Sequence, residues 1–150
     1  MFHPMIRTDR KISKDAALEI LAKGSYGVLC TIGENGYPSG TPLNYADDGE
    51  NIYVHFAAGS VIKNAALNPK VCFTVVTRND VLPQEFTTNY ESVMAFGTAK
   101  EVHGQEKYDA LHLLVKKYSV KFEKEGAAYI GKSIDNCRIF KIKIEHIFSS

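Results

Sequence analysis

The chain contains a series of short strand-like segments that follow one another through tight turns. The segments "YGVLCTI" and "SGTPLNYA" are separated by the turn signal "GENG", and "NIYVHF" follows a second turn signal, "ADDGEN". Asn, Asp and Gly favour the turn conformations that join antiparallel strands. About six strands and three short helices can be identified, and no helix regularly links successive strands. This order argues against a doubly wound sheet and predicts a mainly β protein, a small antiparallel barrel with helices over its ends.

Three segments have the composition of short helices. The first, "SKDAALEILAKG", can begin with Ser13 as its N-cap and can end at Gly24 in a left-handed conformation. The second, "SVIKNAALNPK", is expected to end just before Asn68-Pro69. The third, "QEKYDALHLLVKKYS", is amphipathic.

Two features stand out in the remaining strand-like segments. The segment "NDVLPQEFTTN" is predicted to be a long loop, and long loops in compact domains are commonly functional. Gly97 lies inside the next strand, "YESVMAFGTAKEV", which indicates a bulge or a close approach of another backbone. The last strand, "CRIFKIKIEHIF", alternates polar and apolar residues, which is typical of a half-buried strand.

Length and charge limit the classes of function. The chain has 150 residues, which predicts one domain over residues 1–150 that is large enough to bury a core. The 18 Lys and Arg residues nearly balance 17 Asp and Glu residues, and they form no basic block, so no nucleic-acid partner is expected. No apolar run reaches the length of a membrane span, and the N-terminal segment lacks the apolar region of a signal peptide. We therefore expect no membrane partner and a cytoplasmic location.

The cysteines and histidines indicate neither a disulfide framework nor a metal site. Cys30, Cys72 and Cys137 are far apart in the sequence, and each lies in an apolar strand-like run. This pattern favours buried, reduced thiols in a cytoplasmic protein over a redox thiol or a metal ligand. His55 stands alone at the end of a strand, and the other four histidines have no partner at metal-ligand spacing, so no metal site is predicted.

The segment "HFAAGSVIK" combines small residues, a hydroxyl, a helix start and a lysine. Gly59 and its small neighbours allow a ligand to approach the backbone closely, and Ser60 with the first N–H groups of the helix can receive a phosphate. Lys63, one turn further on, can place its ammonium on the same anion. The spacing is not that of a Walker A loop. An ordinary capped helix with an exposed lysine explains the same residues.

The segment "TPLNY" lies in the strand before the second turn. Pro42 cannot donate to a sheet ladder, so this strand is expected to be interrupted or to lie at an edge. Outward-facing backbone groups there could pair with the edge of a planar heteroaromatic ring. A bent edge strand without a ligand is the alternative interpretation.

Taken in order, "GYPSGTPLNY", "IYVHFAAGSVIKNAALNPKVCFTV" and "YESVMAFGTA" resemble the FMN-binding split-barrel family related to pyridoxamine 5'-phosphate oxidase. The branch that they resemble most is the nitroimidazole-resistance (Nim-type) branch, and the resemblance covers roughly residues 5–148. It implies a six-stranded antiparallel split β-barrel of the FMN-binding type. It also implies a homodimer with two FMN sites at the subunit interface.

The resemblance further implies which residues hold FMN. The "TPLNY" segment would line the isoalloxazine ring, the "AGSVIK" segment would hold the ribityl phosphate, and the "NYES" segment would approach the flavin from the partner subunit. His55 matches a histidine near the flavin and the substrate pocket of Nim-type proteins, which makes it the implied catalytic residue as well as a cofactor contact. The remaining implied cofactor-binding residues are Thr41, Pro42, Leu43, Asn44, Tyr45, Ala58, Gly59, Ser60, Lys63, Asn89, Tyr90 and Ser92.

The function that follows from the resemblance is an FMN-dependent oxidoreductase. It would pass electrons from a nicotinamide or protein donor to a small planar acceptor, for which the family suggests a nitroaromatic, and His55 would donate a proton or a hydrogen bond. Pyridoxamine-phosphate oxidase activity is not expected, because paired basic residues for a substrate phosphate are lacking. The end "EHIFSS" lacks the "TGK"-like tail common in relatives, which leaves the C-terminal contribution to the site open. Two alternatives stay open: a non-catalytic FMN store or sensor, and a cofactor-free barrel that acts as an assembly partner.

Overall fold

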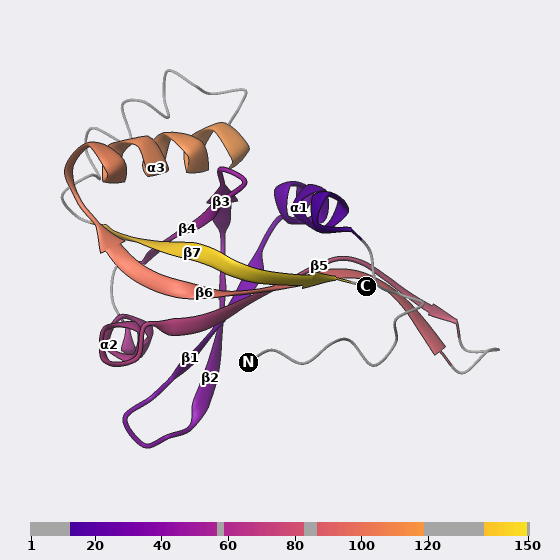
Figure 1. Cartoon of the computed structure of the whole chain (residues 1–150), viewed down its shortest axis with the longest axis horizontal. Coiled ribbons are helices and arrows are strands. Elements are labelled where there is room, and N and C mark those ends of the chain that lie inside the picture. Colours follow the sequence, from indigo (N-terminus) through magenta and orange to yellow (C-terminus); the bar gives the residue numbers. More distant parts are fainter. Residues whose placement is uncertain (1–12, 57–58, 83–86, 119–136, 150) are drawn as a thin grey trace.

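The computed structural model describes residues 13–56, 59–82, 87–118 and 137–149 (Figure 1). Within these ranges the chain forms one curled sheet and three helices. The strands are β1 (Gly27–Ile32), β2 (Pro38–Leu43), β3 (Tyr45–Asp47), β4 (Asn51–Phe56), β5 (Lys70–Leu82), β6 (Thr87–Val102) and β7 (Arg138–Ser149). The helices are α1 (Lys14–Lys23), α2 (Ser60–Leu67) and α3 (Gly104–Tyr118).

The described strands are antiparallel and lie in the order β2-β1-β5-β6-β7-β4-β3. β2 and β3 stand at opposite ends of this order, yet only Asn44 separates them in the chain. The segment Pro38–Asp47 therefore pairs with β1 through its first half and with β4 through its second half. This bent segment joins the two edges of the sheet and closes the barrel. Counted as one strand, it gives the predicted six-stranded split barrel.

Pro42 lies in β2, opposite Val28 of β1. β2 stands at the end of the strand order, so it is an edge strand as predicted. The interruption of the strand comes two residues later, at Asn44.

Two apolar clusters hold the fold together. The larger cluster fills the barrel and includes the fully buried side chains of Leu29, Val54, Phe73 and Ile142, with α1 and α2 packed against it. The smaller cluster lies between α3 and the outer side of β3, β4 and β7, where Leu111 packs. Figure 1 shows α3 over this part of the sheet. Because α3 covers a second apolar surface, β4 is buried on both faces over most of its length.

Ser13 caps α1 as predicted, but the prediction for Gly24 is wrong. The Ser13 hydroxyl accepts a hydrogen bond from the N–H of Ala16 at 3.2 Å. Gly24 has a φ of −66°, which any residue can adopt, so it is not a left-handed stop. A Cβ at this position would lie 2.4 Å from the Tyr45 hydroxyl oxygen and 2.4 Å from Val75. Packing space explains the glycine.

The predicted long loop around residues 79–89 is instead largely an extension of two strands. β5 and β6 stay paired out to Leu82 and Thr87, with an irregularity between Val76 and Arg78. Figure 1 shows this two-stranded arm projecting away from the barrel. The β-branched residues Val81 and Thr88 favour strand structure, and this preference outweighs the turn-like residues around them.

The prediction for Gly97 is confirmed in both respects. The register of β6 against β7 shifts between Phe96 and Gly97. A Cβ on Gly97 would lie 2.1 Å from the carbonyl oxygen of Lys143. The two backbones can come this close only because position 97 carries no side chain.

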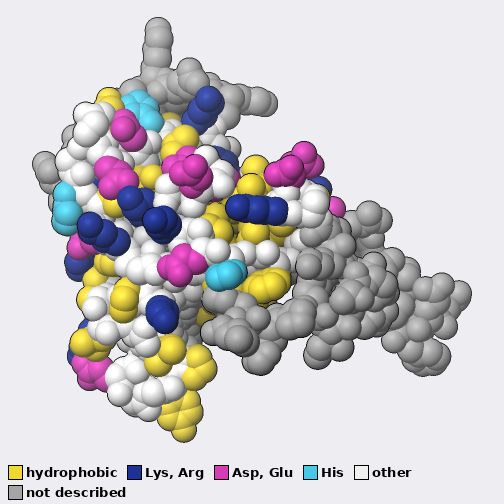
Figure 2. All heavy atoms as spheres, in the orientation of Figure 1, with side chains coloured by type: hydrophobic (Ala, Val, Ile, Leu, Met, Phe, Trp, Pro, Cys, Tyr) yellow, Lys and Arg dark blue, Asp and Glu magenta, His cyan; other side chains and the backbone are white. Residues whose placement is uncertain are grey.

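Charges of both signs are interspersed over the face of the molecule that Figure 2 shows. Among the described helices, none is long and apolar enough to cross a membrane.

Candidate cofactor site

A cavity of about 410 Å³ opens between the β1–β2 turn and the start of α2. The turn supplies its wall on one side, and the first turns of α2 supply the other side. The cavity therefore joins two segments that the sequence separates by more than twenty residues. Its lining residues are Gly33, Glu34, Asn35, Tyr37, Ser39, Ser60, Lys63 and Asn64.

The N-terminus of α2 can receive an anion. Gly59 is its N-cap residue, with a φ of +134°, and no described side chain caps the helix. The first N–H groups of a helix lack intrahelical partners and carry the positive end of the helix dipole. Ser60 is exposed beside them. This end of the cavity thus combines the N–H groups of a helix start, a hydroxyl and partial positive charge.

Lys63 adds a full positive charge to the same cavity. Its Nζ lies 2.7 Å from Oε1 of Glu34 in the β1–β2 turn, and the two side chains are 66% and 60% exposed. An ion pair so accessible to water contributes little to stability. A phosphate with two negative charges could therefore displace the Glu34 carboxylate at small cost.

A buried polar cluster attaches β2 to α2. Asn64 donates from Nδ2 to the hydroxyl oxygen of Thr31 at 3.2 Å and to that of Ser39 at 3.4 Å. The two hydroxyls lie 3.3 Å apart. Sequence reasoning missed Ser39, Asn64 and Glu34 as parts of the site. The available signal was an asparagine on the apolar side of a short helix, where a polar residue needs a partner.

The residues that are candidates for lining the flavin ring, Thr41–Asn44, follow the β2 segment that lines this cavity. Thr41 and Leu43 are half-buried, whereas Pro42 and Asn44 are exposed. In the described sheet β2 has β1 as its neighbour on one side and stands at the end of the strand order. Backbone groups on its outer side can therefore pair with a planar ligand.

Tyr45 occupies a different environment from its neighbours in "TPLNY". Its side chain is fully buried, its ring packs edge-on against Phe73 at 5.0 Å, and its hydroxyl donates to the carbonyl oxygen of Leu21. The Nζ of Lys117 lies 3.5 Å from the centre of the ring. The hydroxyl of Tyr118 accepts from the Tyr45 N–H at 3.0 Å. The Tyr45 side chain therefore belongs to the core and helps to hold α1 and α3 to the barrel.

Burial also changes the acidity of this group of residues. It raises the pKa of Tyr45 far above the usual tyrosine value. Burial lowers the pKa of Lys117, although the nearby Asp47 carboxylate opposes that shift. Among the described residues, the Lys117 ammonium has no hydrogen-bond acceptor. The face of the Tyr45 ring is thus its main favourable contact.

His55 lies on β4, opposite Ile139 of β7. Its side chain projects to the outer side of the sheet and is exposed to solvent, but neighbouring protein atoms bury part of the imidazole. Partial burial lowers the pKa of His55 below its usual value of 6.5. At neutral pH the imidazole is therefore uncharged, and it can donate one hydrogen bond and accept one.

This lowered pKa predicts a pH dependence of stability. Below pH 6.5 the unfolded chain protonates His55, whereas the folded chain does so only at lower pH. The unfolded state then binds more protons, so the free energy of unfolding should fall as the pH drops through this window. NMR titration of the ring protons should give a His55 midpoint below 6.5, and His55→Gln should weaken the pH dependence. A midpoint above 6.5 would contradict the prediction.

The other predicted site residues lie on the arm or outside the described ranges. Ala58 lies outside the described residues. Asn89 and Tyr90 are on β6, opposite Asp80 and Asn79, and their side chains also lie outside the description. Ser92, half-buried, is on β6 at the base of the arm. The structure thus brings Ser60 and Lys63 together around one cavity and leaves the "NYES" segment on the projecting arm.

Comparison with known proteins assigns the family. The family model described as pyridoxamine 5'-phosphate oxidase matches residues 13–147. The chain belongs to this family. The match spans every described helix and nearly all of the described strands, so the split barrel is the fold of the pyridoxamine 5'-phosphate oxidase family.

Solved structures resemble this member of the pyridoxamine 5'-phosphate oxidase family over nearly its whole length. A candidate 5-nitroimidazole antibiotic resistance protein from Bacteroides thetaiotaomicron is 20% identical, with a TM-score of 0.78, over 93% of this chain and 84% of the other. A conserved hypothetical protein from Mycobacterium tuberculosis is 21% identical, with a TM-score of 0.81, over 97% and 89%. An FAD-binding protein from Mesorhizobium loti is 20% identical, with a TM-score of 0.64, over 93% of each chain. At these identities the likeness shows the fold alone. No curated protein matches the chain.

Proposed function

We propose that the chain is an FMN-binding oxidoreductase of the Nim type, which passes electrons from a nicotinamide or protein donor to a small planar acceptor such as a nitroaromatic. One observation carries the proposal: the uncapped N-terminus of α2 and Lys63 form one end of a cavity whose wall continues into the edge strand β2. Anion-binding groups beside an open strand edge suit a phosphate joined to a flat heteroaromatic ring. The FAD-binding relative supports a flavin.

The chain would bind and orient the flavin, and the flavin would supply the redox chemistry. Ser60, Lys63 and the first N–H groups of α2 would hold the phosphate, while the outer backbone groups of Thr41–Asn44 would pair with the ring edge. The Ser39–Asn64 hydrogen bond supports this arrangement because it keeps β2 and α2 at a constant separation. The choice of FMN over FAD rests on the family resemblance.

His55 would act on the acceptor. With its pKa lowered by burial, it is neutral at physiological pH and would donate a hydrogen bond from its N–H to an oxygen of the acceptor. Proton donation from the charged form would increase as the pH falls. This role is separate from binding of the phosphate, which depends on Ser60 and Lys63.

The proposed active unit is a homodimer with the flavin at the subunit interface. The projecting arm of β5 and β6 supports it, because residues on the arm stand away from their own barrel but could reach a second copy (Figure 1). Val76 and Met94, at the base of the arm, are 47% and 40% exposed. A contact between subunits at the base of the arm would cover these two apolar side chains. Asn89, Tyr90 and Ser92 would then approach the flavin of the partner.

The decisive experiment is an absorbance spectrum of the purified protein before and after addition of FMN and desalting. Flavin bands that stay with the protein are expected, and a flat spectrum would overturn the proposal. Addition of NAD(P)H without oxygen then tests the oxidoreductase role. Bleaching of the bound flavin is expected for a nicotinamide-linked enzyme. If neither NAD(P)H nor a protein reductant bleaches it, the result favours an FMN store or sensor.

Lys63→Ala should weaken FMN binding about 10- to 100-fold, because charge-assisted hydrogen bonds contribute about 1.5–3 kcal/mol. Binding of riboflavin, which has no phosphate, should not change.

Glu34→Gln should tighten FMN binding by at most about fivefold. The change removes the carboxylate that competes with the phosphate for Lys63, and such an exposed ion pair contributes no more than about 1 kcal/mol. Fluorescence titration of each variant and of the wild type measures these dissociation constants. Lys14→Ala, on α1, is the control, and an equal loss of FMN and riboflavin affinity in Lys63→Ala would contradict the phosphate role.

A further inference from the structure

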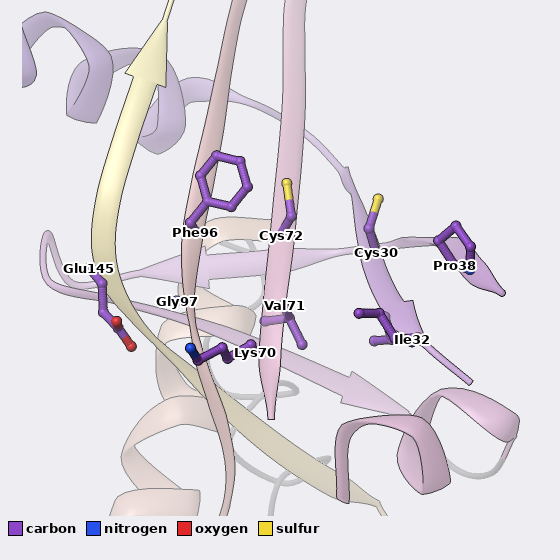
Figure 3. A pocket seen from close by; sticks show the side chains of 10 residues that line it. Cys30, Ile32, Pro38, Lys70, Val71, Cys72, Phe96, Gly97 and Glu145 are labelled. Atoms are coloured by element: carbon purple, nitrogen blue, oxygen red, sulfur yellow. The ribbon is translucent and has the colours of Figure 1, made fainter. Parts of the chain in front are cut away.

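A second cavity, of about 380 Å³, lies on the outer face of the sheet. Figure 3 shows its walls: Cys30 and Ile32 from β1, Cys72 from β5 and Phe96 from β6, with Glu145 of β7 toward one end. Most of this surface is apolar. Two of the residues that line it are cysteines, and the proposed flavin site uses neither of them.

Cys30 and Cys72 face each other across two strands. They are direct partners in the antiparallel pairing of β1 with β5, and Leu29↔Phe73 and Val28↔Thr74 fix the register beside them. Opposed residues in such a pair project to the same face and have Cβ atoms about 4.5–5.5 Å apart. In Figure 3 both sulfur atoms project to the same side of the sheet.

This spacing is close to what a disulfide requires. A disulfide joins residues whose Cα atoms are about 4.4–6.8 Å apart and whose Cβ atoms are about 3.5–4.5 Å apart. The opposed Cα atoms of an antiparallel pair fall in that range. A small approach of the two strands would therefore suffice, and neither strand would have to change its register.

The third cysteine has a different location. Cys137 packs against the smaller apolar cluster beneath α3. Cys30 and Cys72 are both half-buried and open to the outer cavity, and the sulfur of Cys72 lies 3.8 Å from the hydroxyl of Thr74. Phe96, a wall of this cavity, opposes Cys72 and is two residues from Met94 on β6, so the cavity adjoins the proposed dimer contact at Val76 and Met94.

We propose that Cys30 and Cys72 are a reversible dithiol–disulfide pair that a peroxide oxidises. Cys30 supplies the attacking thiolate, because burial raises the pKa of the Cys72 thiol and disfavours its ionisation. The Cys30 sulfur attacks the peroxide, the O–O bond breaks, and a sulfenic acid and water form. The thiol of the other cysteine then attacks the sulfenic sulfur, an S–S bond forms, and a second water leaves. The two cysteines together lose two electrons, and hydrogen peroxide gains them as it becomes two waters. This inference does not depend on the proposed flavin.

The disulfide would alter the outer cavity and the pairing of β1 with β5. It would join β1 to β5 covalently and replace two thiols on the cavity wall by one apolar bridge. β1 also leads into the turn that carries Glu34, so the cross-link lies at the base of the hairpin that lines the cofactor cavity. The bridge would face the outer cavity, and exposed disulfides are more readily reduced by thiols than buried ones.

The test is treatment of the full chain with hydrogen peroxide, followed by alkylation and mass spectrometry of its peptides. The number of free thiols should fall from three to one, with a Cys30–Cys72 linked peptide that dithiothreitol removes. Cys137→Ser should still form the linked peptide, whereas Cys30→Ser and Cys72→Ser should not. Three persistent thiols, oxidation of single cysteines to sulfinic acid, or linkage through Cys137 would each overturn the proposal.

Discussion

Replacing Gly97 by alanine should lower the free energy of unfolding by about 3 kcal/mol or more. The new Cβ would lie 2.1 Å from the carbonyl oxygen of Lys143 and 2.9 Å from its carbonyl carbon. Both are backbone atoms of a paired strand, so no side-chain rotation can relieve the overlap. β6 and β7 would have to separate at the bulge, and hydrogen bonds next to it would be lost.

Urea unfolding of the purified protein measures this effect. Gly49→Ala is a matched control, because Gly49 has a φ of +90° but none of the described atoms lies within 4 Å of the added Cβ. It should cost only about 1–2 kcal/mol, through the unfavourable backbone conformation. Equal losses in the two variants would show that steric overlap at Gly97 is not the cause.

Replacing Tyr45 by alanine should cost about 3–5 kcal/mol, as is usual for a large buried aromatic side chain. The change removes the contact with Phe73, the hydrogen bond to Leu21 and the ring face beneath the Lys117 ammonium. Tyr45→Phe keeps the ring and loses only the hydroxyl, so it should cost about 1 kcal/mol. Thermal and urea unfolding of both variants give the comparison.

The Tyr45→Phe variant also tests the role of this side chain in cofactor binding. If Tyr45 belongs only to the core, the dissociation constant for FMN should not change in this variant. A change of more than about tenfold in this dissociation constant would contradict a core role. It would indicate that the Tyr45 hydroxyl contacts the flavin. Lys63→Ala provides the positive control for a loss of FMN affinity.

Much of the fold could be predicted because the information is local. Turn residues separate the strands, Ser13 can cap only the helix that follows it, and Gly97 stands out inside an otherwise regular strand. The arm was missed because Asn79 and Pro83 are common in loops, although the two strands that pair there are close in sequence. Gly24 was misread for a different reason, since the atoms that exclude a side chain there belong to the distant residues Tyr45 and Val75.

The candidate site divides in the same way. Ser60 and Lys63 are one helical turn apart, so their shared cavity follows from local spacing. Glu34, Ser39 and Asn64 join the site through contacts between distant segments, which no spacing reveals. Tyr45 was grouped with Thr41 because it follows in the same segment. Asn44 interrupts the strand between them, and beyond this point the side chain of Tyr45 enters the core.

The bent segment Pro38–Asp47 also bears on how the barrel can open. β2 pairs with β1 and β3 pairs with β4, and the peptide chain joins β2 to β3 directly. The barrel is therefore closed at this point by covalent bonds. While both strands stay paired, the distance between the end of β2 and the start of β3 cannot exceed the span of the one residue Asn44. The same covalent link means that strand exchange between molecules cannot begin at a free chain end on this side of the barrel.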